Sequence, residues 1–203
     1  MKKAWKRMVI SFFAAVIAWM GMLVYDRQTL RQELIRLHVV AASDSAEDQA
    51  VKLQVKDAVV NSLQADLEKL RDAGEAEAYL QENLPKIEAL ANRVLREAGI
   101  DDVVNVSLKA EEFPTRDYDT FSLPAGIYQA LRITIGPGQG QNWWCVAFPG
   151  LCLPATAEGF EDAASCAGLS DGLTATLEER SGYEIRFWLL DALGQLENFL
   201  HQE

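Results

Sequence analysis

The chain has 203 residues, of which 49% are hydrophobic and 24% are charged, so it can bury a core and is not a disordered tail. Its charge is split: residues 1–27 hold five basic residues and one acid, whereas the remainder has a net charge of −15. An acidic domain of this kind repels phosphate backbones, so we predict no nucleic-acid partner. The acidity itself is explained most simply by solubility.

A membrane-targeting segment comes first along the chain. Four basic residues among the first eight precede an uncharged run at residues 8–25, which is at the short end for a membrane-spanning helix. Basic residues before the span place the N-terminus in the cytoplasm and the rest of the chain outside. We expect residues 1–27 to be a retained signal anchor, because no clear cleavage site follows; a cleaved signal peptide is the alternative.

A strand and two helices are predicted next. Residues 34–42 alternate, with Arg36 and His38 on one side of the strand, after a polar, helix-compatible stretch at residues 26–34 that continues the anchor. Ser45 then begins a helix that runs to about Ala73 with Gly74 as its stop. A second helix covers residues 75–98, and Pro85 predicts a break or kink inside it.

The second half of the chain is strand-like. Strand patterns at residues 103–108, 116–120, 129–135 and 143–148 are joined by short Pro/Gly connections, which favours an antiparallel meander. The fold class is therefore α+β, with two N-terminal helices packed on a mostly antiparallel sheet behind an N-terminal membrane helix. We expect the main domain at residues 28–154, a flexible acidic loop at 155–182, and a strand and short helix at 183–203 that complete the domain.

Nothing in the sequence indicates a catalytic centre, a metal site or a cofactor. The glycines at 136, 138 and 140 suggest a phosphate loop, but no helix and no Lys-Ser/Thr pair follow them, so a tight turn between strands is favoured. His38 has no nucleophile-elbow serine beside it, which favours a structural or interface role. The carboxylate pairs at 101–102, 111–112 and 117/119 are expected on solvated surfaces.

Three cysteines and two tryptophans mark the later block. If Phe148 and Pro149 form a hairpin tip, Cys145 and Cys152 face each other, and we predict a disulfide between them; two buried thiols are the alternative. Cys166 is then unpaired. On a strand, Trp143 and Trp144 point to opposite faces, so one is expected in the core and the other is a candidate anchor for a partner protein, unless residues 183–200 partly cover both.

These motifs together resemble a known family. The front blocks read Arg-Leu-His-Val-Val-Ala-Ala-Ser-Asp-Ser at 36–45, Glu-Asp-Gln-Ala at 47–50 and Lys-Leu-Gln-Val-Lys-Asp-Ala-Val at 52–59. The later blocks read Ala-Gly-Ile-Tyr-Gln-Ala-Leu-Arg-Ile at 125–133, Gly-x-Gly-x-Gly at 136–140 and Asn-Trp-Trp-Cys-Val-Ala-Phe-Pro-x-Leu-Cys at 142–152. Over residues 30–154 the chain resembles stage II sporulation protein R of spore-forming Gram-positive bacteria. It departs at Gly150, where the family often has proline, and at 155–182, which carries no matching signature.

The resemblance implies a function. Members of that family are made in the forespore and exported into the space between the forespore and mother-cell membranes. There they activate a membrane-embedded aspartic protease of the mother cell, which processes the pro-form of the early mother-cell sigma factor. The chain would then be a signal and not an enzyme, and its location would be the forespore membrane or the intermembrane space.

We therefore expect a protein partner, the protease, and membrane attachment through the anchor. The residues predicted to bind this partner are Arg36, His38, Asp44, Asp48, Trp143 and Trp144. Two rival functions remain open. One is an extracytoplasmic cell-wall hydrolase that uses Glu111, Glu112, Asp117 and Asp119. The other is a peptidoglycan-binding module that uses an exposed tryptophan.

Overall fold

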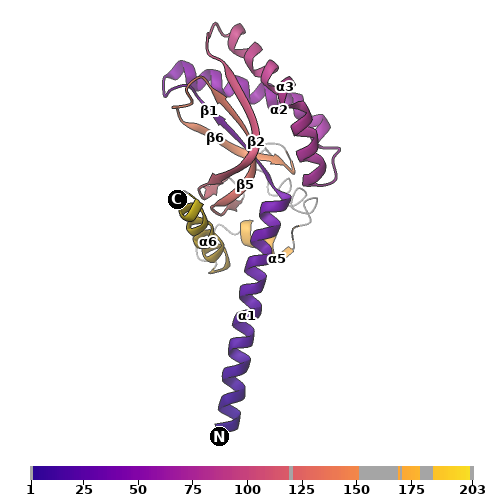
Figure 1. Ribbon diagram of the computed structural model, residues 1–203, viewed down its shortest axis with the longest axis vertical. Coiled ribbons are helices and arrows are strands. Elements are labelled where there is room, and N and C mark those ends of the chain that lie inside the picture. The colour runs from indigo at the N-terminus through magenta and orange to yellow at the C-terminus, as the bar shows by residue number, and fades with distance from the viewer. Residues whose placement is uncertain (1, 119–120, 151–168, 170, 179–184, 202–203) are drawn as a thin grey trace.

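A computed structural model describes residues 2–118, 121–150, 169, 171–178 and 185–201 (Figure 1). The fold is α+β, as predicted. Its elements in chain order are α1 (Lys2–Glu33), β1 (Ile35–Val40), α2 (Ala46–Leu67), α3 (Ala73–Glu97), β2 (Val104–Phe113), β3 (Arg116–Asp117), β4 (Ser122–Leu123), β5 (Gly126–Ile135), β6 (Asn142–Phe148), α5 (Asp171–Glu178) and α6 (Ile185–His201).

The main sheet has four strands in the order β2-β5-β1-β6, and β3 pairs with β4 in a separate two-stranded sheet. Strand β1 runs parallel to β5 and antiparallel to β6, while β2 is antiparallel to β5. The predicted meander is wrong at β5 and β6, because β1 lies between them. All six residues of β1 are buried, so this first strand takes a central position with both faces covered.

Helices α2 and α3 cover one face of the sheet. The predicted start of α2 after Ser45 is confirmed. Val51, Val55, Val59 and Leu63, which recur every four residues along it, are all buried in the core. The helix ends at Leu67, however, and not near Gly74. Asp72 caps the next helix by accepting the backbone N–H of Glu75, so Gly74 lies in the first turn of α3.

Pro85 does not break α3, which is helical from Ala73 to Glu97. The proline ring is exposed and cannot donate to the carbonyl of Gln81, while Asn83 donates its side-chain amide to the carbonyl of Tyr79 at 2.8 Å. The predicted break is therefore wrong, since packing of the buried face on the sheet keeps the helix continuous on both sides of the proline.

The end of α1, together with α5 and α6, covers the second face. Two predictions fail here. Residues 171–178 form α5 instead of a flexible loop, and residues 185–189 belong to α6 instead of a strand; most of the rest of 155–182, and Tyr183, lie outside the described residues. The helix is favoured because Leu190, Gly194 and Glu197 recur at helical spacing on the side that meets the domain.

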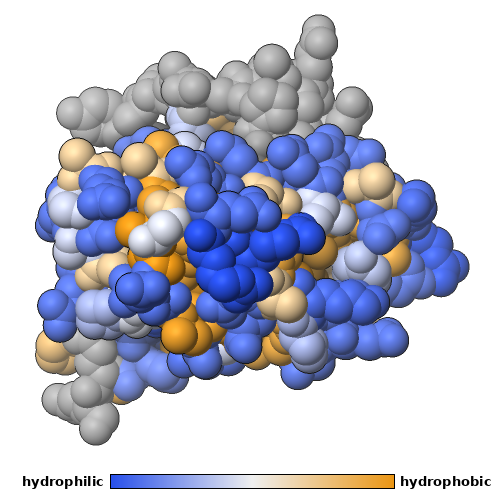
Figure 2. All heavy atoms as spheres, turned by 90° about the horizontal axis from the view of Figure 1, so that it is seen from above, coloured by the Kyte–Doolittle hydropathy of each residue, from blue (hydrophilic) through white to orange (hydrophobic). Residues whose placement is uncertain are grey.

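Helix α1 projects from the domain as a long arm (Figure 1). Among the described helices it is the one long and apolar enough to cross a membrane, and only 6% of its most apolar stretch is buried. Residues 26–33 continue the helix, as predicted. The strand β1 leads away from α1, so it ends on the side of the domain away from the arm (Figure 1). Figure 2 views the molecule from this side and shows mainly hydrophilic side chains.

Candidate partner-binding site

The two groups of sequence motifs meet in space where β1 ends. The backbone N–H groups of Gln139 and Gly140 donate to the carbonyls of Ala42 and Ala41 at 3.1 and 3.0 Å. The carboxylate of Asp44 accepts the backbone N–H of Gln141 at 2.7 Å. Residues 43–48 and 138–143 therefore form one packed unit, which we call the motif end.

Glycine is required at the centre of the motif end. A Cβ atom on Gly140 would lie 2.2 Å from the carbonyl oxygen of Ser43, and Gly138 has a φ of +62° with a Cβ position 2.5 Å from Thr134. Because the N–H groups of Gly138, Gln139 and Gly140 all donate to backbone carbonyls, they are not available to a phosphate. The glycine-rich segment is thus a tight connection between strands, as predicted.

A hydrogen-bond network fixes the start of α2 against this connection. Ser45 caps the helix by accepting the backbone N–H of Asp48 at 3.1 Å, and the hydroxyl of Ser43 donates to the carboxylate of Asp48. Lys52 donates to the side-chain oxygen of Gln49 at 2.6 Å and to the carbonyl of Gln141 at 3.0 Å. Asp48, which was predicted to bind a partner, is therefore occupied largely within the domain.

Lys52 was missed by the sequence reasoning. It is 5% exposed, and burial lowers the pKa of its ammonium group, which the negative charge of Asp44 partly offsets. Its signal in the sequence is a lysine directly after Val51 in the buried stripe of α2. A lysine there needs a polar partner inside the fold, and Gln141 supplies the carbonyl.

The two tryptophans point to opposite faces, as predicted. Trp143 is 38% exposed, and the ammonium of Lys56 lies 4.9 Å from the centroid of its ring. Trp144 is half-buried on the other face, stacked on His38 with the ring centroids 3.9 Å apart. Asp44, which bonds to Gln141 two residues before Trp143, is also exposed.

Arg36 and His38 do not lie on the surface, although both were predicted to contact a partner. Arg36 is 0% exposed, with its guanidinium 4.5 Å from the ring centroid of Phe113 and one N–H donated to the hydroxyl of Tyr118 at 2.8 Å. His38 is 5% exposed. The prediction took alternate positions of the strand as solvent-facing, but α1, α5 and α6 close that face.

Glu111 is the acidic partner of this buried group, and its role was also missed. One carboxylate oxygen lies 3.3 Å from Nδ1 of His38, and the other accepts from Arg132 at 3.3 Å. Burial alone would raise the pKa of Glu111, but the hydrogen bonds from His38 and Arg132 and their charges outweigh it, so the pKa lies below its usual value. The three residues lie on three different strands, β1, β2 and β5, so no local sequence pattern predicts their contact.

The carboxylates of the rival hydrolase do not converge. Glu112 lies 2.9 Å from Nδ1 of His201, and Asp117 accepts the hydroxyl of Ser122 at 2.6 Å, whereas Glu111 points to His38. Asp119 lies outside the described residues. Within the described ranges, no group of three or more His, Cys, Asp or Glu side chains could hold a metal ion.

The predicted disulfide stays a prediction. Cys145 is buried in β6, where it is 6% exposed and pairs in register with Leu37 of β1. Cys152 and Cys166 both lie outside the described residues.

Comparison with known proteins identifies the family. The family described as Stage II sporulation protein R matches residues 31–158. A relative, stage II sporulation protein R of Bacillus subtilis (strain 168), is 38% identical over 121 residues, which are 60% of this chain and 54% of the relative, so the match spans about half of the relative's length. No solved structure matches the chain. With its two motif groups joined at one end of the sheet, the chain belongs to the stage II sporulation protein R family.

Proposed function

We propose that the chain is an exported sporulation signal that activates a membrane-embedded aspartic protease of the mother cell. Activation leads to processing of the pro-form of the early mother-cell sigma factor. The observation that carries this proposal is that two of the family's sequence blocks meet at residues 43–48 and 138–143, on the side of the domain away from the membrane helix (Figure 1). A signal anchored in one membrane and read by a receptor in the facing membrane needs its contact surface at that end.

The proposed contact surface consists of Asp44, Trp143 and the exposed side chains of the motif end around them. Tryptophan is enriched among residues that dominate binding energy, and the exposed carboxylate of Asp44 adds charge complementarity toward a basic group of the partner. Trp144, which is half-buried, borders this surface on the other face of the sheet. Arg36, His38 and Asp48 act from within by holding β1 and the start of α2 in place.

Binding alone is sufficient as a mechanism. A ligand shifts a receptor between two states only by its difference in affinity for them. The domain would bind the active arrangement of the protease more tightly, so the bond-breaking chemistry stays in the receptor. This agrees with carboxylates that bond to separate partners in the described part of the domain.

Co-expression in a non-sporulating host tests the proposal. The protease and its pro-sigma substrate are expressed with the intact chain, with Asp44→Asn or with Trp143→Ala, and cleavage of the substrate is measured. We expect each variant to lower cleavage by about tenfold or more, the loss typical of a central interface residue. The matched control is Glu82→Gln, which removes one exposed carboxylate from α3 and should leave cleavage unchanged.

Export and folding must be equal among the variants, as judged by membrane fractionation and resistance to proteolysis. Full cleavage without the chain, or full activity of both motif-end variants, would contradict the proposal. The exposed Trp143 favours a peptidoglycan-binding module as the second candidate. Retention of the intact chain on purified peptidoglycan, lost in Trp143→Ala, would support that candidate instead.

A further inference from the structure

Helix α6 is docked rigidly on the second face of the sheet. A Cβ atom on Gly194 would lie 1.6 Å from the carbonyl oxygen of Ala125, so the helix touches the backbone at this point. Asp191 accepts the backbone N–H of Ala125 at 2.8 Å, and Asn198 donates to the carbonyl of Phe113 at 2.9 Å. These contacts fix which side of α6 faces the domain.

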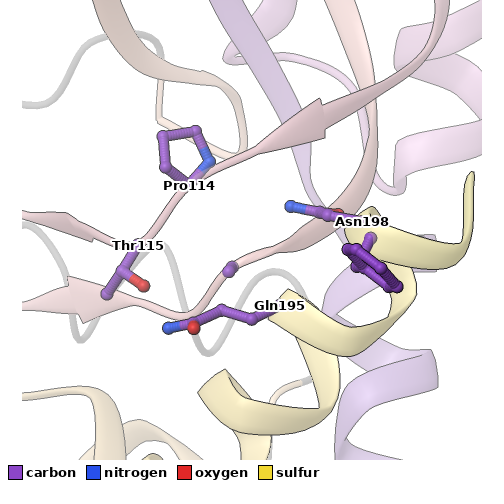
Figure 3. Close-up of a pocket in the computed structure, with 6 residues that line it drawn as sticks. Pro114, Thr115, Gln195 and Asn198 are labelled. Carbon is purple, nitrogen blue, oxygen red and sulfur yellow. The ribbon is translucent and has the colours of Figure 1, made fainter. Parts of the chain in front are cut away.

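The same contacts leave an apolar side of α6 uncovered. In Figure 3, Gln195 and Asn198 lie beside the pocket that Pro114 and Thr115 also line, and this pocket has a volume of about 300 Å³. Beyond it, large apolar side chains are exposed. They are Trp188 (66%), Leu196 (55%), Phe199 (63%) and Leu200 (61%). Four exposed apolar side chains on one docked helix form a patch of the kind that marks an interaction surface.

The position of α6 along α1 shows what adjoins this patch. Leu23 lies inside the uncharged run at residues 8–25, yet it is 4% exposed and belongs to the same buried cluster as Leu173 of α5 and Leu190 of α6. Eighteen helical residues span about 27 Å, slightly less than the roughly 30 Å of a bilayer's hydrocarbon core. The whole run is therefore needed to cross, and the domain elements around Leu23 must reach the lipid surface.

Ion pairs hold α6 beside the end of the uncharged run of α1. Glu197 pairs with both Arg27 and Arg31, which lie two and six residues after the uncharged run ends on α1. Asp26 is 2% exposed, so the boundary between the run and the polar part of α1 is enclosed by the domain and not held away from it. No flexible spacer separates the membrane helix from the domain, because α1 is continuous to Glu33 and β1 begins at Ile35.

We propose that the apolar side of α6 rests in the interface of the membrane that α1 crosses, with Trp188 at headgroup level. The occupant of the patch is the lipid surface of that same membrane. This inference rests on the retained anchor of the proposed function. The domain would contact the membrane that α1 crosses at two places, through α1 and through α6. Together these contacts would hold the motif end pointing away from the bilayer. Tryptophan suits the interface because its ring is apolar and its N–H is polar.

The test uses the full chain in phosphatidylcholine vesicles, some of which carry bromine in the upper part of the acyl chains. Trp5 and Trp19 of α1 are replaced by phenylalanine, so that Trp143, Trp144 and Trp188 report. We expect brominated lipid to quench one component of the fluorescence, and Trp188→Phe to remove that component. The emission left in Trp188→Phe, from Trp143 and Trp144 in β6, should be insensitive to the brominated lipid.

A second pair of variants keeps the test decisive if Trp188→Phe folds poorly. Leu196→Asp should reduce the quenching severalfold, whereas Val103→Asp, at a side chain 69% exposed and far from α1, should not change it. The inference is overturned if aqueous acrylamide quenches Trp188 while brominated lipid does not. It is also overturned if the protection of Trp188 depends on the protein-to-lipid ratio, which indicates a second copy on the patch. No protease is present, so these results are independent of whether the receptor is activated.

Discussion

The two faces of the sheet are built by different means. The face under α2 and α3 is closed by aliphatic side chains that recur at regular spacing along each helix. The other face holds Arg36 and His38 among aromatic rings. Helices α1, α5 and α6 close it with leucines, and α6 adds polar contacts through Asp191 and Asn198. The first face tolerates change in proportion to the volume lost, whereas the second depends on individual atoms.

The close contact between α6 and the backbone of Ala125 tests whether the second face depends on individual atoms. Gly194→Ala places a Cβ atom against the backbone carbonyl of Ala125, which cannot move aside as a flexible side chain would. We therefore expect α6 to shift and the free energy of unfolding to fall by about 3 kcal/mol. Gly21→Ala is the matched control, since nothing lies within 4 Å of its Cβ position. Chemical denaturation in detergent measures both. Equal stability of the two variants would show that α6 is loosely held.

Arg36 tests whether a buried charge stabilises the second face. Among the described residues, its Nε and Nη1 atoms have no hydrogen-bond partner. We therefore expect Arg36→Met, which keeps the volume, to be within about 1 kcal/mol of the parent or more stable, while Arg36→Ala loses about 3 kcal/mol through the cavity. Thermal and denaturant unfolding distinguish them. A Met variant as unstable as the Ala variant would mean that the charge itself is required.

Glu111 gives a smaller effect that depends on pH. Glu111→Gln should lower the free energy of unfolding by about 1–2 kcal/mol at neutral pH, because His38 and Arg132 lose a charged acceptor. The pKa of Glu111 is lower in the folded than in the unfolded state. The stabilisation is therefore full above the usual glutamate pKa of about 4.3 and is lost as the pH falls through the folded value. The difference between variant and parent should shrink in that acid range; a constant difference would refute the coupling.

The first face was largely predictable from the sequence, and the second was not. The strand near residues 34–42 and the helix that begins at Ser45 were both predicted correctly as element types. The alternation in β1 was wrongly interpreted as one exposed side, because all six of its residues are buried. Alternation does not report which strands pair, so the central position of β1 between β5 and β6 was missed. At residues 185–189 the pattern fits a strand as well as a helix, and the contact of Gly194 with Ala125, which lies far away in the sequence, decides for the helix.

The candidate site divides in the same way. Asp44 and Trp143 were chosen from motif residues and are exposed, whereas Trp144 is half-buried; that they bind a partner stays a prediction. Lys52 and Glu111 were missed, since each acts through a partner more than 70 residues away in the chain. Arg36 and His38 were assigned to the surface because the sequence does not show that a second layer of helices covers them.

Site-directed photo-crosslinking tests the central claim, that the motif end is the surface through which the signal is passed. A photo-reactive amino acid replaces either the exposed Glu47 of the motif end or the exposed Glu82 of α3, in cells that also express the protease. Our account predicts a crosslinked product with the protease from position 47 and none from position 82. A product from position 82 alone, with cleavage of the sigma factor intact, would contradict it.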